Sequence, residues 1–167
     1  MKITAVVPAK GESQRLENKN LKQLGGVSLV ELACEKLLKS KYIDDAYIDT
    51  ESERIISEVQ HLFSKGLKLI QRPKELATNS IGGNEMFVYS LHSVQETDIL
   101  IHHYCTSPLI KPSTIDKVIG KFVNNMNEND SFLTVVEDKG YYWSREGDPI
   151  NFETDTLPNS QELEGKY

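Results

Sequence analysis

Four cationic side chains lie close together near the start of the chain, and together they could bind an anion. Between positions 10 and 22 the sequence has four cations and only two carboxylates, in a chain of net charge -6. Gly11 lets the backbone turn and present its N–H groups, and Ser13 adds a hydroxyl donor. This composition suits a triphosphate. The cations are Lys10, Arg15, Lys19 and Lys22.

An ordinary solvated loop is the alternative interpretation of the same stretch, because loops are generally polar and exposed. Two well-known phosphate motifs do not fit. The stretch lacks the Gly-Lys-Ser/Thr ending of a P-loop, and it lacks the three glycines of the dinucleotide fingerprint. A phosphate site here therefore needs another loop geometry.

The elements that must position this loop alternate between strands and helices. Apolar runs predict strands over 3–9, 46–49, 67–70, 98–101 and 131–136. Helical periodicity predicts helices over 29–37, 55–63, 84–94 and 112–126. In the third helix we expect Phe87, Leu91 and Val94 to share one side. The alternation predicts an α/β fold with three layers, in which helices cover both faces of a mostly parallel sheet.

The last predicted helix has the clearest apolar repeat in the chain, and Pro112 opens it. After position 137 the pattern weakens. The run 141–143, Tyr-Tyr-Trp, is either a strand or an aromatic packing patch, and residues 145–167 are polar and rich in turn formers. The apolar positions of the helix are Ile115, Val118, Ile119, Phe122, Val123 and Met126.

Histidine and cysteine side chains offer little chemistry in this sequence. His102 and His103 are neighbours on a predicted strand, so they point to opposite faces and cannot both bind one metal ion. We expect a polar core or surface role for each. Cys34 and Cys105 are too few for a disulfide framework or a zinc site, and we expect two buried thiols.

Bulk composition excludes several classes of protein. The chain has 167 residues, enough for one domain with a real core. Its negative net charge argues against nucleic-acid binding, which needs a basic face. No apolar run approaches the ~20 residues that span a bilayer, and the first residues do not form a signal peptide. We therefore expect a cytoplasmic protein that binds no membrane.

Three short segments near the N-terminus keep a distinctive order and spacing: residues 7–15, 19–21 and 24–30. Together they resemble the opening signature of the acylneuraminate cytidylyltransferase family, with Lys10 where that family usually has arginine. A lysine keeps the charge but loses the bidentate fork. Later motifs of the family resemble residues 49–55, 72–80 and 106–109.

This resemblance implies an enzyme of the nucleotide-diphospho-sugar transferase type. Such an enzyme transfers CMP from CTP to an acidic keto-sugar, a sialic acid or a bacterial relative, and releases pyrophosphate. It further implies that Lys10, Arg15 and Lys19 hold the phosphates. The residues implied to contact the nucleotide are Ala9, Gly11, Ser13, Asn20, Arg72, Asn79, Thr106 and Ser107.

Other roles stay open for some of these residues. Arg72 could form an ion pair instead, and Thr106 with Ser107 could cap the next helix. For the whole chain, the alternatives are another sugar nucleotidyltransferase and a nucleotide-binding fragment with impaired catalysis.

The resemblance also implies a domain organisation. Residues 1–136 would form the nucleotide-binding domain, and 137–167 the start of a dimerisation and sugar-binding extension. A homodimer is expected. The family binds Mg²⁺ through a later Asp-x-Asp segment, so we assign no metal ligand in this chain. We expect either a fragment of a longer protein or a truncated form.

Overall fold

The computed structural model describes residues 1–13, 15–78 and 80–167, which form two compact units. The first unit is Met1–Asn124 and contains all the named strands and nearly all the helical residues. The second unit is Asn125–Tyr167. No helix among the described residues is long and apolar enough to cross a membrane.

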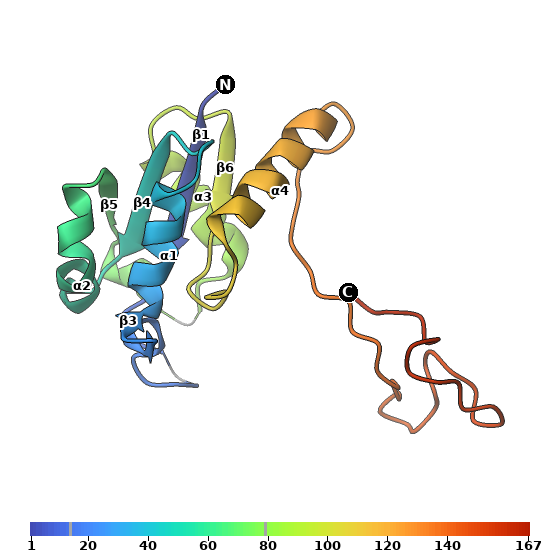
Figure 1. The fold of residues 1–167 in the computed structure, drawn as a ribbon. Helices are drawn as coiled ribbons and strands as arrows, with labels where there is room; N and C mark the ends of the chain where they lie inside the picture. Colours follow the sequence, from blue (N-terminus) through green and yellow to red (C-terminus); the bar gives the residue numbers. More distant parts are fainter. Residues whose placement is uncertain (14, 79) are drawn as a thin grey trace. The chain divides into compact units, whose positions relative to one another are not determined.

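Four parallel strands form the sheet of the first unit, in the order β5-β4-β1-β6 (Figure 1). Val6 in the central strand pairs with Tyr47 on one side and His102 on the other. A separate two-stranded hairpin turns through Gly25 and Gly26, which both have positive φ. The strands of the sheet are β1 (Ile3–Pro8), β4 (Asp45–Thr50), β5 (Leu67–Gln71) and β6 (Ile99–His102), and those of the hairpin are β2 (Gln23–Leu24) and β3 (Val27–Ser28).

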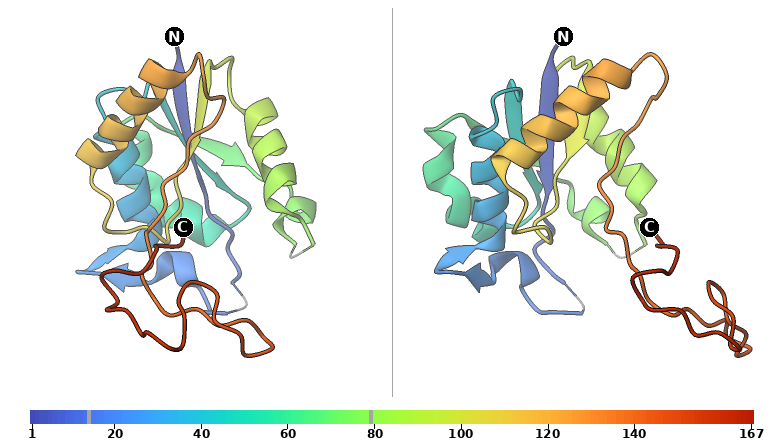
Figure 2. Two further views of the ribbon diagram at one scale, coloured as in Figure 1. Left: turned by 90° about the vertical axis from the view of Figure 1, so that its right-hand side faces the viewer. Right: turned by 45° about the vertical axis from the view of Figure 1, so that its right-hand side comes forward.

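Helices cover both faces of the sheet, which confirms the expected three-layer α/β fold (Figure 2). Side chains alternate along β1, so that Ala5 and Val7 face three helices while Val6 faces the fourth. The three helices are α1 (Leu29–Leu38), α2 (Glu53–Phe63) and α4 (Pro112–Asn125), and the fourth is α3 (Gly83–Ser93). The short 3₁₀ helices are η1 (Lys19–Leu21) and η2 (Lys74–Ala77).

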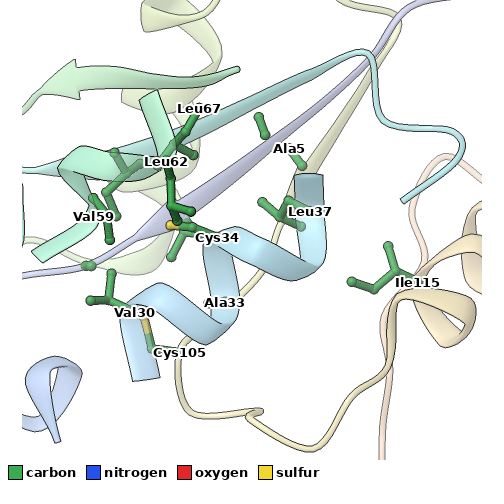
Figure 3. Packing of buried hydrophobic residues seen from close by; sticks show 14 of the residues in the cluster. Ala5, Val30, Ala33, Cys34, Leu37, Val59, Leu62, Leu67, Cys105 and Ile115 are labelled. Carbon is green, nitrogen blue, oxygen red and sulfur yellow. The ribbon is translucent and has the colours of Figure 1, made fainter. Parts of the chain in front are cut away.

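The main core lies between the sheet and helices α1, α2 and α4 (Figure 3). Val30 and Leu37 of α1 and Leu62 of α2 are almost completely buried in it. Helix α4 adds Ile115 and Ile119, with Phe122 and Val123 packed against the same core, so most of its predicted apolar stripe faces the core. Met126, the last residue of the predicted stripe, lies beyond the helix and is 42% exposed.

The two cysteines confirm the expectation of buried thiols. Cys34 lies on α1 and Cys105 follows β6, and both are buried and free. Figure 3 shows them among the apolar side chains of the core. Burial raises the pKa of the Cys34 thiol well above its ordinary value, so it stays protonated and unreactive.

The predicted side of α3 is confirmed only in part. Val94 packs against the sheet with Tyr89 in a second, smaller cluster, and Phe87 stacks on His102 of β6 with ring centroids 4.0 Å apart. Leu91 is 49% exposed, whereas the fully buried residue beside it is Ser90. Hydrophobic periodicity cannot anticipate a polar residue on the buried side of a helix.

The second unit differs from the sequence prediction. Residues 131–136 form no strand, and all of them are exposed. An extended segment becomes a strand only when a neighbour pairs with its backbone, and the only bridges described in this unit lie later in the chain. The boundary between the two compact units lies after Asn124. Of the two interpretations of Tyr-Tyr-Trp, the structure shows aromatic packing. The rings of Tyr141 and Trp143 each contact the Phe152 ring edge-on, with ring centroids 5.0 Å apart.

Candidate functional site

The predicted site residues of the first unit meet at one edge of the sheet. Because all four strands are parallel, the loops after them leave from the same side. The cationic loop follows β1, Arg72 follows β5, and Thr106 and Ser107 follow β6. The structure thus places these residues on the edge where open α/β sheets bind ligands.

Three hydrogen bonds attach the start of the cationic loop to its surroundings. The Ala9 N–H donates to the Asp49 carbonyl at 2.9 Å, which extends the pairing of β1 with β4. The Gly11 N–H donates to Oε1 of Glu51 at 2.7 Å. The side-chain amide of Asn20, which is buried, donates to the Lys10 carbonyl at 2.9 Å. The loop therefore has a defined path along the end of β4.

A glycine is required at position 11 by a close approach of the backbone. A Cβ atom there would lie 2.7 Å from Cβ of Ser52 and 2.9 Å from its Oγ. Real Cβ atoms do not come this close to other heavy atoms, so any side chain would push the loop away from the start of α2.

The cations of the loop differ in exposure. Arg15 is exposed, whereas Lys10, Ser13 and Lys19 are partly buried. Burial raises the pKa of the Cys105 thiol to about 12, and the positive charges of Lys19 and Lys36 act against this rise. The positive charge of Lys19 therefore acts on the start of the loop after β6.

Arg72 lies in a buried ion pair with Asp49. Its Nε donates to Oδ1 at 3.0 Å, and its Nη2 donates to Oδ2 at 2.8 Å and to the Asp49 carbonyl at 3.1 Å. The two side chains are 4% and 0% exposed. Burial raises the pKa of Asp49, and the Arg72 guanidinium opposes that rise. The structure thus contains the ion pair that was the alternative role for Arg72. A contact between Arg72 and a nucleotide stays a prediction. Asn79 lies outside the described residues.

The loop after β6 presents Thr106 and Ser107 in a tight turn. Thr106 is exposed, Ser107 is partly buried, and the Ser107 N–H donates to the Tyr104 carbonyl at 3.1 Å. Helix α4 begins only at Pro112, so the capping alternative for these two residues is wrong. Lys36 of α1 holds the same loop, because its Nζ donates to the Pro108 carbonyl at 2.6 Å.

His102 and His103 point to opposite faces of the sheet, as strand alternation predicts. His102 stacks on Phe87 of α3 with ring centroids 4.0 Å apart, and its pKa is lowered to about 4 by burial and by the charge of Arg72. His103 is buried, and its pKa is lowered to about 4 by burial and by the charge of Lys36. Both imidazoles are therefore neutral at pH 7.

A sequence profile of the family described as "Cytidylyltransferase" matches residues 4–161 of the chain. The chain belongs to the cytidylyltransferase family. Among its relatives, the 3-deoxy-manno-octulosonate cytidylyltransferases of Geotalea daltonii and Chloroherpeton thalassium are 30% and 28% identical to it. The alignments cover 71% and 95% of this chain, and 44% and 70% of those relatives. The pseudaminic acid cytidylyltransferase of Campylobacter jejuni is 24% identical over 77% of the chain and 56% of the relative.

Solved structures of cytidylyltransferases and related synthases have the same fold. A CMP:2-keto-3-deoxy-manno-octonic acid synthetase complexed with CTP superimposes with a TM-score of 0.62 at 22% identity, covering 75% of this chain and 49% of the other. The 4-diphosphocytidyl-2C-methyl-D-erythritol synthase of Anaerococcus prevotii superimposes with a TM-score of 0.60 at 15% identity, covering 99% of this chain and 67% of the other. The chain spans only about half of several curated cytidylyltransferases that it matches.

In the described ranges, no group of three histidine, cysteine, aspartate or glutamate side chains could hold a metal ion. A surface depression beside η1 and α2 contains none of the predicted site residues. It is lined by Leu21, Glu53, Arg54, Ser57 and Glu58.

Three residues whose side chains bond to the loops of the candidate site were not predicted: Asp49, Glu51 and Lys36. Asp49 and Glu51 have a signal in the sequence, since a carboxylate that ends a buried apolar strand lies at the ligand edge of a parallel sheet. Lys36 has no such signal in the sequence. It lies within α1, and its contact with the Pro108 carbonyl forms only in the folded chain.

The buried histidines predict how the stability of this cytidylyltransferase chain depends on pH. Their pKa values are about 4 in the folded chain, against an ordinary value of 6.5. As the pH falls from 6.5 toward 4, the two imidazoles become protonated in the unfolded chain but stay neutral in the folded chain. The free energy of unfolding should therefore fall over this window, by on the order of 3 kcal/mol for the buried His103 and by less for His102, which is partly exposed.

Thermal melting of His103→Gln between pH 7 and pH 4.5 checks this expectation. The variant should lose less melting temperature on acidification than the unchanged chain, whatever its absolute stability. His92→Gln is the matched control, because His92 is exposed on α3. Equal pH slopes for His103→Gln and the unchanged chain would contradict the assignment of His103 as a neutral buried group.

Proposed function

We propose that this chain is the nucleotide-binding part of an enzyme that transfers CMP from CTP to an acidic keto-sugar and releases pyrophosphate. The observation that carries the proposal is the cationic loop after β1, which hydrogen bonds attach to the edge of a parallel sheet in a member of the cytidylyltransferase family. The likeness to a synthetase solved with CTP supports the choice of nucleotide.

In the proposed reaction, the anomeric hydroxyl of the sugar attacks the α-phosphate of CTP. The bond between the α-phosphorus and the bridging oxygen breaks, pyrophosphate leaves with the electron pair, and the proton of the attacking hydroxyl is released to water. Negative charge develops on the leaving group, and the work of the protein is to position two anions and to neutralise this charge. We assign that role to Lys10, Arg15 and Lys19, as phosphate clamps and not as proton donors.

The remaining site residues would bind the nucleotide. We assign the Ser13 hydroxyl and the later backbone N–H groups of the loop to the phosphates, since the Ala9 and Gly11 N–H groups donate to Asp49 and Glu51. We assign Asn20 to the shape of the loop through its bond to the Lys10 carbonyl. Thr106 and Ser107 are placed on the neighbouring loop, where their hydroxyls can donate. Arg72 would contact the nucleotide only through donors that Asp49 leaves free.

The acceptor proposed here is an eight- or nine-carbon keto-sugar acid. Relatives named for 3-deoxy-manno-octulosonate and for pseudaminic acid support this class. Sialic acid remains within the proposal as a third member of the same class. Magnesium dependence and homodimer formation are proposed on the resemblance of the sequence alone.

Calorimetric titration with CTP, UTP, GTP and ATP tests the nucleotide, and pyrophosphate release with a panel of keto-sugar acids tests the reaction. The proposal expects tightest binding of CTP and release with at least one acid. A preference for another nucleotide would favour a different sugar nucleotidyltransferase. Binding of CTP without release by any acid would favour a nucleotide-binding part that does not catalyse the reaction by itself.

A further inference from the structure

Glu51 connects two loops at the ligand edge of the sheet. It directly follows β4, and its Oε1 accepts the Gly11 N–H at 2.7 Å from the loop that follows β1. No sequence motif assigned a role to this residue. A carboxylate that accepts a backbone N–H makes a charge-assisted hydrogen bond, which is stronger than one between neutral groups.

The environment of Glu51 differs from that of a solvated surface carboxylate. The residue is only partly exposed, and its second oxygen, Oε2, is buried and has no hydrogen-bond partner among the residues that the structure describes. A carboxylate oxygen is costly to bury without a partner. This cost is tolerated where the other oxygen fixes the backbone of a loop, and the loop here is the proposed phosphate site.

The contact acts on the most adaptable point of that loop. Gly11 has the greatest backbone freedom of any residue type, so its position must be fixed from outside. Glu51 fixes it on the side of β4, while the buried Asn20 side chain holds the adjacent Lys10 carbonyl at 2.9 Å. Ser52 of the same segment lies against Gly11 so closely that no side chain fits between them.

We propose that Glu51 is a positioning residue, which acts through Gly11 to hold the phosphate loop in the shape that receives the triphosphate. This inference rests on the proposed function. Glu51 touches neither CTP nor the acceptor, and its charge is directed to the backbone amide. Its loss should therefore weaken the binding of CTP and leave the chemical step unchanged once CTP is bound.

The test compares Glu51→Ala with Glu51→Gln in the full-length protein. The glutamine side-chain carbonyl can still accept the Gly11 N–H, whereas alanine cannot. Glu51→Ala should raise the KM for CTP by about tenfold or more, with kcat and the KM for the acceptor unchanged, and Glu51→Gln should restore most of the loss. Glu53→Gln is the control, because Glu53 is exposed on the first turn of α2.

A second variant tests the same contact without changing Glu51. Gly11→Ala would place a Cβ atom 2.7 Å from Cβ of Ser52 and move the loop away from Glu51. It should raise the KM for CTP in the same way. Adding Ser52→Gly removes the clashing atoms and should lower the KM again. This pair keeps the test decisive if Glu51→Ala does not fold.

The outcomes separate this inference from the proposed function. If the unchanged protein binds no CTP, both are wrong. If it binds CTP but Glu51→Ala binds CTP equally well or more tightly, only the positioning role is wrong, and a tighter complex would mean that Glu51 competes with the phosphates. A fall in kcat at unchanged KM would also overturn the positioning role.

Discussion

Replacing Lys19 with alanine is expected to slow pyrophosphate release by about 100-fold or more, the usual cost of removing one group that stabilises developing charge. Lys19 begins η1 at the end of the cationic loop and is partly buried there, and its positive charge opposes the rise in the pKa of Cys105 in the loop after β6. Steady-state assay of pyrophosphate release in the full-length protein measures the effect.

Lys22→Ala is the matched control for Lys19→Ala. Lys22 carries the same charge at the far end of the same stretch, but it is exposed and follows η1. Its loss should change turnover little, and both variants should melt close to the temperature of the unchanged protein. If the two variants were equally active, Lys19 would have no part in the site.

Replacing Asp49 with alanine is expected to cause the largest loss of stability. It would leave the Arg72 guanidinium buried without its partner, and removal of one member of a buried pair costs about 3–5 kcal/mol. The melting temperature should fall by on the order of 10 °C for a unit of this size. Thermal or denaturant unfolding followed by circular dichroism measures the change.

Asp45→Ala is the control within the same strand. Asp45 pairs with Lys2 and Lys68, whose side chains are 35% and 41% exposed. Exposed pairs contribute about 0–1 kcal/mol, so this variant should lose much less stability. In a second comparison, replacing both Asp49 and Arg72 by apolar residues should restore stability relative to Asp49→Ala. Equal losses for Asp49→Ala and Asp45→Ala would contradict the energetic role of the buried pair.

The sheet could be predicted because local amino-acid composition is sufficient to identify its strands. Residues such as Val6 and Val7 form apolar runs that are buried from both sides, and such runs separated by amphipathic helices have few alternative arrangements. The prediction failed where local composition was not sufficient. Residues 131–136 have the right side chains for a strand, but pairing depends on a partner that the described chain does not provide.

The site was predicted only in part, and for a physical reason. Sequence pattern located the cations and Gly11, because these residues are close together in the chain. The contacts that shape the site join residues far apart in sequence. Asp49 meets Arg72, and Glu51 meets Gly11, across separations of 23 and 40 positions. Such pairs follow from the order of the strands, and no local pattern contains that order.

The most direct test of the central claim is an NMR titration of this chain with CTP. Backbone amide shifts locate the nucleotide without requiring turnover. If the loop after β1 holds the triphosphate, the largest saturable shifts will appear at Gly11, Ser13 and Lys19. Shifts that instead cluster on the amino-terminal edge of the sheet, or no saturable shift at any amide, would contradict the account.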